Sequence, residues 1–176
     1  MLPLIILTGP TGSGKSETAQ ALARKLDTAI ISADSMQVYK YFDIGTAKPS
    51  LAAREEIQHH LIDILEPNEE FNAFIFKTRA LEIILKLMKQ GKVPILVGGT
   101  GLYIKTLIED YDCAEGTSLK TREKIWENIC RQGVEKVYQE LQRVDPEYAT
   151  KISKTDSIRI VRALAVYLDT GKRFSE

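Results

Sequence analysis

The 176-residue chain is 44% hydrophobic, 7% aromatic and 27% charged, a globular composition that excludes collagen-like, low-complexity and disulfide-scaffold proteins. Its 24 basic and 24 acidic residues give a formal net charge of zero, which disfavours a nonspecific nucleic-acid coat protein but leaves local basic patches open. Cys113 and Cys130 form no CxxC pair, and neither a leader peptide nor a membrane span is evident, so we expect free thiols in a cytoplasmic protein.

Strands and helices alternate along the first part of the chain. The predicted strands cover residues 4–7, 29–33, 61–65 and 93–97. The predicted helices cover residues 16–26, 71–90 and 102–108, and the apolar face of the second contains Phe74, Leu81, Ile84, Leu85 and Met88. This alternation predicts an α/β fold in which a parallel sheet has helices on both faces.

Helices alone are predicted after residue 112. They cover residues 120–131, 134–144 and 157–168, and Gly133 and Gly171 end the first and the last of them. We therefore interpret residues 1–112 as an α/β core, 113–153 as a small helical insertion and 154–176 as a return helix to the core.

One motif lies between the first predicted strand and the first predicted helix. It reads Gly9-Pro10-Thr11-Gly12-Ser13-Gly14-Lys15-Ser16 and matches GxxxxGK[ST] in full. In such a P-loop, backbone N–H groups and the following helix N-terminus point at phosphate oxygens. We expect Lys15 to be an exposed, unpaired ammonium that neutralises the outer phosphate, and Ser16 to ligate Mg²⁺. The motif predicts a P-loop NTPase-like, nucleotide-binding fold with a site for a di- or triphosphate, ATP included.

Two further segments follow predicted strands at the same edge of the sheet. Asp34 ends the second strand, and because ligands of open parallel sheets bind along this edge, its carboxylate is predicted to face the phosphate site. A helix cap or a solvated acid is the alternative for this residue. Residues 98–101, Gly-Gly-Thr-Gly, follow the last strand and favour equally a ligand contact or a tight turn capped by Thr100.

Two other features narrow the chemistry. Asp34 and Asp63 are the acids at predicted strand ends, and the strand at 93–97 lacks the terminal acid of ATPase motors, which favours a transferase. His59 and His60 are adjacent, and adjacent residues of a strand point to opposite faces, so a structural role is favoured over metal binding.

A set of motifs, in order along the whole chain, resembles the tRNA dimethylallyltransferase (tRNA isopentenyltransferase) family. They are GPTGSGKS at 9–16, ISADSMQVY at 31–39, DIGTAKPS at 43–50, HHLIDILEP at 59–67, LVGGTGLYI at 96–104 and RALAVYLDTGKRFSE at 162–176. The resemblance implies transfer of the dimethylallyl group of dimethylallyl diphosphate to N6 of the adenosine 3′ to the anticodon. The implied partners are that donor and the anticodon stem-loop of tRNA, with no membrane, and we expect a monomer.

The resemblance also implies roles for individual residues. Asp34 corresponds to the general base at N6, and Thr100 to a threonine that contacts tRNA and substrate; with Lys15 they form the expected catalytic set. The contacts with the flipped tRNA base correspond to Ser35, Met36 and Gln37. The tRNA contacts in the helical part correspond to Arg122, Ile158, Arg159, Ile160, Val161 and Arg162.

The chain departs from the family pattern in composition and in length. The family usually has alanine at Gly12, glutamine at Ile158 and glutamate at Ala165. Family members also continue well past Glu176 with a basic segment that grips tRNA, so the chain corresponds to their amino-terminal portion.

Two alternative functions stay open at the level of the sequence. One is a P-loop small-molecule kinase in which Asp34 activates an acceptor hydroxyl and Arg122 and Arg131 act as lid arginines. The other is an inactive nucleotide-binding fragment.

Overall fold

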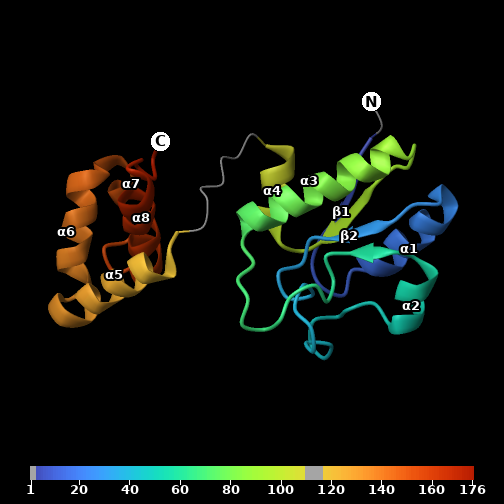
Figure 1. Ribbon diagram of the computed structural model, residues 1–176, viewed down its shortest axis with the longest axis horizontal. Coiled ribbons are helices and arrows are strands. Elements are labelled where there is room, and N and C mark those ends of the chain that lie inside the picture. Colours follow the sequence, from blue (N-terminus) through green and yellow to red (C-terminus); the bar gives the residue numbers. More distant parts are fainter. Residues whose placement is uncertain (1–2, 110–116) are drawn as a thin grey trace. The chain divides into compact units, whose positions relative to one another are not determined.

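The computed structural model describes residues 3–109 and 117–176. The chain divides into two compact units, Met1–Cys113 and Ala114–Glu176, which we call the sheet unit and the helical unit (Figure 1). The boundary predicted at residues 112 and 113 and the predicted free thiol of Cys113 lie outside the described residues, whereas Cys130 is an exposed free cysteine. Within the described residues, no helix combines the length and the apolarity needed to cross a membrane.

Parallel strands form the centre of the sheet unit. In residues 3–109 the strands join into one sheet of order β1-β4-β2-β3, made of β1 (Ile5–Thr8), β2 (Ile30–Ser32), β3 (His59–His60) and β4 (Ile95–Gly98). Ile95 is the register partner of both Ile5 and Ile30, and every pairing is parallel. The predicted parallel sheet is therefore confirmed. Because its strands all run the same way, the loops that follow β1, β2 and β4 meet at one edge.

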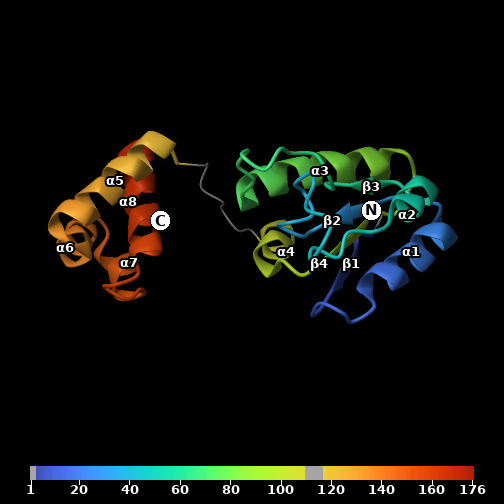
Figure 2. The same cartoon turned by 90° about the horizontal axis from the view of Figure 1, so that it is seen from below.

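Helices cover both faces of this sheet (Figure 2). They are α1 (Lys15–Leu26) on one face, and α3 (Ala73–Lys89) and α4 (Gly101–Ile108) on the other. The small residues Ala19 and Ala23 let α1 pack closely on the sheet, while Phe76 of α3 stacks on Tyr103 of α4 with ring centroids 4.3 Å apart. The short helix α2 (Leu51–Glu56), which precedes β3, was not predicted.

The strand predicted at residues 61–65 is wrong. The paired strand is β3, and after it Leu61 and Asp63 adopt positive φ angles of 62° and 52°, which end the extended conformation. Leu65 forms only an isolated bridge. A sequence pattern of apolar residues does not show these backbone conformations, since neither position is glycine.

The helix predicted at residues 71–90 is confirmed as α3, but part of its predicted apolar face is exposed. Leu81 and Leu85 are 38% and 55% exposed. The buried residues are Ile84, which belongs to the predicted apolar face, and Phe76, Ala80 and Leu87, which do not. Apolar residues lie on several sides of this helix, so their spacing fits more than one face. The small Ala80 and the flat ring of Phe76 allow the closer approach to the sheet.

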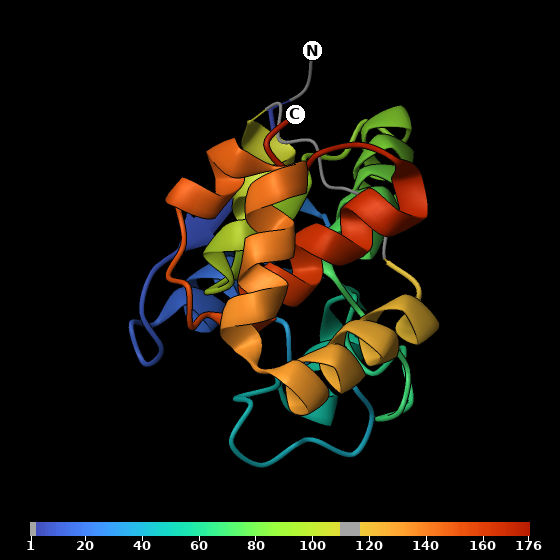
Figure 3. The ribbon, with the colours of Figure 1, turned by 90° about the vertical axis from the view of Figure 1, so that its left-hand side faces the viewer.

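Helices alone form the helical unit within residues 117–176. They are α5 (Leu119–Gln132), α6 (Val134–Val144), α7 (Pro146–Thr150) and α8 (Ser157–Thr170), drawn from yellow-orange to red in Figure 3. Asp145, 1% exposed, caps α7 by accepting the N–H of Tyr148 at 3.0 Å and accepts the N–H of Ser175 at 2.9 Å. Burial raises the pKa of the Asp145 carboxyl, but these bonds outweigh burial and hold that pKa below its ordinary value.

The last helix, α8, packs inside the helical unit. Its apolar side packs against α5 and α6 in one hydrophobic core, and the buried residues are Ile160, Val161, Ala163, Leu164, Ala165 and Val166. The division predicted between residues 153 and 154 is therefore no boundary between packed units. Ala165, where the resembled family usually has glutamate, is fully buried, and a small apolar side chain fits that position.

Candidate functional site

The loop between β1 and α1 has the backbone that its motif requires. The predicted order of strand, glycine-rich loop and helix is confirmed. Gly12 and Gly14 adopt positive φ angles of 82° and 79°, a conformation that strains residues with a Cβ atom. α1 begins at Lys15, so the N–H groups of its first turn have no carbonyl partner inside the helix. The loop therefore offers N–H donors and a helix dipole to an anion.

Lys15 is not the unpaired ammonium that the motif led us to expect. Its Nζ donates to the backbone carbonyl of Pro10 at 2.5 Å and to Oγ of Ser13 at 3.5 Å. An ammonium carries three donors, and the curled loop brings the Pro10 carbonyl within their reach. A phosphate would therefore replace a contact of Lys15 inside the loop.

A cavity of about 500 Å³ lies beside this loop at the carboxyl edge of the sheet. The predicted site residues that line it are Thr11, Gly12, Ser13, Gly14, Lys15, Ser16, Asp34, Met36 and Gln37. Gly9, Pro10, Ser35 and Thr100 are not among the lining residues. Other lining residues were not predicted, chiefly Gly45, Thr46, Ala47, Pro49, His59 and Ile62. The segment at 45–49 carries a resemblance motif, but it has no periodicity from which its position could be inferred.

The Asp34 carboxylate is oriented by its own loop. Its Oδ1 accepts the backbone N–H of Met36 at 2.8 Å and that of Gln37 at 3.2 Å. Within residues 3–109 and 117–176, no side chain or backbone group donates to Oδ2. The sequence left two alternatives for Asp34, a cap and a group that faces the phosphate site. The structure is compatible with both, because Oδ1 caps a turn while Asp34 lines the cavity and its Oδ2 accepts no bond from the described residues.

β2 and β4 approach each other closely where they end. A Cβ atom on Gly98 would lie 2.2 Å from the carbonyl oxygen of Ala33, so this position requires glycine. Thr100 occupies the N-cap position of α4, but its hydroxyl makes no capping bond and instead accepts the backbone N–H of Ser35 at 3.1 Å. Gly98 therefore serves strand packing, and Thr100 ties the loop after β4 to the loop that carries Asp34.

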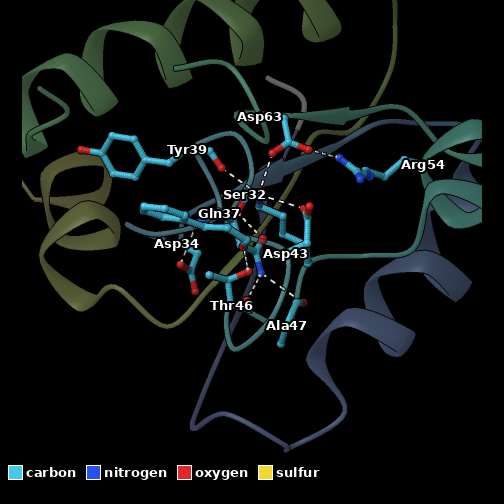
Figure 4. A network of polar contacts seen from close by, with 11 residues as sticks. Ser32, Asp34, Gln37, Tyr39, Asp43, Thr46, Ala47, Arg54 and Asp63 are labelled. Carbon is cyan, nitrogen blue, oxygen red and sulfur yellow. Dashed lines mark hydrogen bonds and ion pairs between the residues drawn. The ribbon is translucent and has the colours of Figure 1, made fainter. Parts of the chain in front are cut away.

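Gln37 uses its side-chain amide within the protein (Figure 4). Its Oε1 accepts the hydroxyl of Ser32 at 2.9 Å. Its Nε2 donates to the carbonyls of Thr46 at 3.0 Å and Ala47 at 3.3 Å. The amide therefore ties one wall of the cavity to β2.

His59 lines the cavity although the sequence indicated only a structural role for it. Its Nδ1 lies 2.7 Å from the carbonyl oxygen of Ile57, and because a carbonyl only accepts, Nδ1 carries the proton. Burial lowers the pKa of His59; the bond to Ile57 raises it, and the charge of Arg54 lowers it further. The neutral ring thus keeps Nε2 as an acceptor.

The predicted tRNA-contacting residues of the helical unit differ in exposure. Ile160 and Val161 are 0% and 3% exposed and belong to its hydrophobic core, so their side chains stabilise the unit. The exposed or half-buried members are Arg122, Ile158, Arg159 and Arg162. Of the six predicted tRNA-contacting residues, only these four can therefore contact a partner at the surface of the unit through their side chains.

The predicted metal ligand, Ser16, is exposed in the first turn of α1 and lines the cavity. In the part of the chain that the structure describes, no group of three or more His, Cys, Asp or Glu side chains is placed so that it could hold a metal ion. Mg²⁺ prefers oxygen ligands, keeps several waters and often binds through substrate phosphates with few protein groups. Ser16 therefore fits a cation that is held jointly by the protein and a phosphate ligand.

The sequence matches the family model described as IPP transferase over residues 37–176. Similar proteins include the tRNA dimethylallyltransferases of Hydrogenobaculum sp. (strain Y04AAS1), 47% identical over 97% of this chain, and of Aquifex aeolicus (strain VF5), 47% identical over 99%. This chain covers 57% of each of these proteins, so it spans little more than half of their length.

Two solved structures extend this similarity to the fold. One is a eukaryotic dimethylallyltransferase acting on tRNA, with a TM-score of 0.84, 35% identity, and coverage of 99% of this chain and 44% of that one. The other is a tRNA isopentenylpyrophosphate transferase from Bacillus halodurans, with a TM-score of 0.62, 35% identity, and coverage of 98% and 57%. The predicted α/β fold is confirmed, and the chain belongs to the IPP transferase family.

Proposed function

We propose that this protein transfers a dimethylallyl group from dimethylallyl diphosphate to N6 of the adenosine 3′ to the anticodon of tRNA. One observation carries the proposal: the P-loop and Asp34 line a single cavity of about 500 Å³. The reaction needs this pair, since the donor releases a diphosphate and the acceptor amine loses a proton. The names of the similar proteins support the same reaction.

The P-loop serves the donor in this proposal. When the bond between the allylic carbon and the diphosphate breaks, the leaving group takes the electron pair and needs its negative charge stabilised. Loop N–H groups and the Lys15 ammonium do this once Lys15 exchanges its bond with Pro10. Mg²⁺ held by Ser16 and the phosphate oxygens would add charge neutralisation.

Asp34 serves the acceptor. An exocyclic adenine amine is a weak nucleophile, and a positioned base that takes up its proton contributes ~10²–10⁴-fold to the rate. Oδ1 of Asp34 is fixed by two N–H groups, which leaves Oδ2 for that proton. The adenine has to leave its stack in the anticodon loop to reach this oxygen.

The contacts with the flipped base divide among neighbouring residues. Met36 is 46% exposed and lines the cavity, so its flexible apolar side chain suits the face of a base. The residue before it, Ser35, donates its backbone N–H to the hydroxyl of Thr100, which holds this segment in place. Because the Gln37 amide is bonded to the protein, we assign Gln37 to the shape of the site more than to reading the base.

The remaining partner assignments are part of the same proposal. Arg122, Ile158, Arg159 and Arg162 are proposed to contact tRNA from the surface of the helical unit. The predicted monomer and the cytoplasmic location stay predictions.

Mass spectrometry of an anticodon stem-loop tests the proposal. The stem-loop is incubated with the protein, dimethylallyl diphosphate and Mg²⁺, and the expected product carries one dimethylallyl group on the adenosine 3′ to the anticodon. The Asp34→Asn protein is the matched control and should yield little product. Modification that requires ATP as donor and places a phosphate on a small acceptor would instead support the kinase alternative.

A further inference from the structure

We propose that Lys48 is a positioning residue: it fixes the loop at residues 43–47 and, through Gln37, the direction of the Asp34 carboxylate. This proposal rests on the function proposed for Asp34. Lys48 is absent from the residues that line the cavity, so it acts on the site only through its neighbours.

The Lys48 side chain is buried and fully engaged. It is 2% exposed, and its Nζ donates to the carbonyl of Tyr39 at 2.7 Å, to Asp63 Oδ1 at 2.6 Å and to Asp43 Oδ1 at 3.2 Å. Burying an ammonium is costly unless its donors are satisfied, and here three acceptors meet three donors. The bonds of Lys48 therefore fix the relative positions of three backbone segments.

Asp63 connects this ammonium to Gln37. Arg54 binds its second carboxylate oxygen, and Figure 4 shows the two side chains pointing toward each other. Burial raises the pKa of Asp63, but the bonds from Lys48 and Arg54 outweigh burial and lower it, so the carboxylate stays charged. The backbone N–H of Asp63 donates to the carbonyl of Gln37 at 3.1 Å.

The loop that Lys48 holds has an unfavourable backbone of its own. Ala47 adopts a φ of 50°, in the left-handed region where a residue with a Cβ atom is strained. Such a conformation persists when surrounding bonds fix it, and the carbonyls of Thr46 and Ala47 accept the amide of Gln37. The loop and Gln37 thus hold each other, with Lys48 as the buried anchor at the end of the loop.

Gln37 completes the connection to the reacting group. Its backbone N–H donates to Asp34 Oδ1 at 3.2 Å, next to the N–H of Met36 at 2.8 Å. A displaced Gln37 would turn the carboxylate and move Oδ2. Misplacing a catalytic group by about 1 Å costs as much as ~10²-fold in rate.

Hydrogen exchange of Lys48→Met tests this connection without relying on activity. Lys40→Met is the matched control, because Lys40 lies in the same segment and pairs with Glu66 at 2.7 Å, but is 42% exposed. In Lys48→Met we expect the Met36 and Gln37 amides to lose protection by ~10-fold or more, while the Ala33 amide in the sheet keeps its protection. Lys40→Met should change none of the three.

Kinetics separates positioning from plain stability. Lys48→Met should lower kcat by ~10-fold, with kcat calculated per mole of protein that binds donor. The Kd for the donor, measured by calorimetry, should change by no more than about twofold. Unchanged exchange at Met36 and Gln37, or an equal loss at Ala33, overturns the proposal. If Lys48→Met does not fold, the isosteric Asp63→Asn should give the same local pattern, and a pattern like that of Lys40→Met overturns it. Failure of the unaltered protein to transfer a dimethylallyl group would refute the proposed function. The hydrogen-exchange result would still show whether Lys48 fixes Gln37 and the Asp34 loop.

Discussion

The two walls of the cavity are held in different ways. The P-loop wall is exposed, and Lys15 bonds only within its own loop, to Pro10 and Ser13. The other wall, at residues 34–48, is bonded within itself through the side chains of Asp34 and Gln37. It is also tied to other segments of the sheet unit, because Gln37 bonds Ser32 of β2 and Lys48 bonds Asp63. A wall with few bonds of its own is completed by its ligand, whereas a wall with many is organised before the ligand arrives.

Lys15→Ala should have the largest effect, because it removes the positive charge of the P-loop wall. We expect affinity for dimethylallyl diphosphate to fall by ~10²-fold or more, the scale of a lost charged hydrogen bond to phosphate. The free energy of unfolding should hardly change, since Lys15 bonds only an exposed loop. Calorimetry measures the binding, and Lys25→Ala, exposed at the other end of α1, is the control. Equal donor affinity in Lys15→Ala and the unaltered protein would remove the P-loop assignment.

Gly98→Ala should separate β2 from β4 and so disturb the wall at residues 34–48, which follows β2. The added Cβ would lie 2.2 Å from the carbonyl oxygen of Ala33, so the backbone has to move. Overpacking of this kind costs about 1–3 kcal/mol in the free energy of unfolding, measured with urea. Gly101→Ala is the control, because its Cβ would meet nothing within 4 Å. If both variants are equally stable, the close approach of the strands is not a constraint.

Gly12→Ala, in the P-loop wall, should have a smaller effect on stability and on donor affinity. Gly12 has open space for a Cβ but a φ of 82°, so alanine costs about 1 kcal/mol through backbone strain alone. Donor affinity should stay within a few-fold, in agreement with the alanine that the family usually has there. Urea unfolding and calorimetry check the two expectations. An affinity loss as large as that of Lys15→Ala would show that this residue's backbone is critical for phosphate binding.

The smallest expected effect is a pH dependence of stability from His59 and His60. Burial is the main cause that lowers both pKa values below the ordinary 6.5, so the unfolded chain binds more protons below pH 6.5. Their contribution to stability is therefore complete above pH 6.5 and decreases as the pH falls through the lowered folded-state values. The carboxylates with lowered pKa values, among them Glu56 and Asp63, lose their contribution only below their ordinary 4.5 and 3.8.

Urea unfolding between pH 4.5 and pH 7 measures that dependence. Replacement of both histidines by glutamine should flatten the curve in this window. A curve of unchanged slope in the double variant would assign the dependence to other groups.

The P-loop wall was largely predictable from the sequence, and the wall at residues 34–48 was not. The P-loop has Gly14 in the left-handed region, and the motif specifies glycine at that position. The alternation of strands and helices likewise places Asp34 at the correct edge of the sheet. By contrast, the positive φ angle of Ala47 has no residue-type signal, and nothing in the sequence pattern pairs Lys48 with its acceptors Tyr39 and Asp63, which lie 9 and 15 residues away.

The helical elements show the same limit. Helix boundaries follow from caps and breakers, and Gly133 and Gly171 end α5 and α8 as predicted. Which face of α3 is buried depends on the fit of Ala80 and Phe76 to the sheet, which the spacing of apolar residues does not determine. The packing partner of α8 is likewise a property of tertiary contacts, not of its own sequence.

The central claim is that Asp34 acts on the acceptor while the P-loop acts on the donor, and the Asp34→Asn protein tests it most directly. Asparagine keeps the shape and one acceptor oxygen but takes up no proton. Measured in the transfer reaction with an anticodon stem-loop, kcat should fall by ~10²-fold or more while the Kd for dimethylallyl diphosphate stays unchanged. A raised donor Kd with an unchanged kcat would contradict the claim and make Asp34 a phosphate- or metal-binding residue.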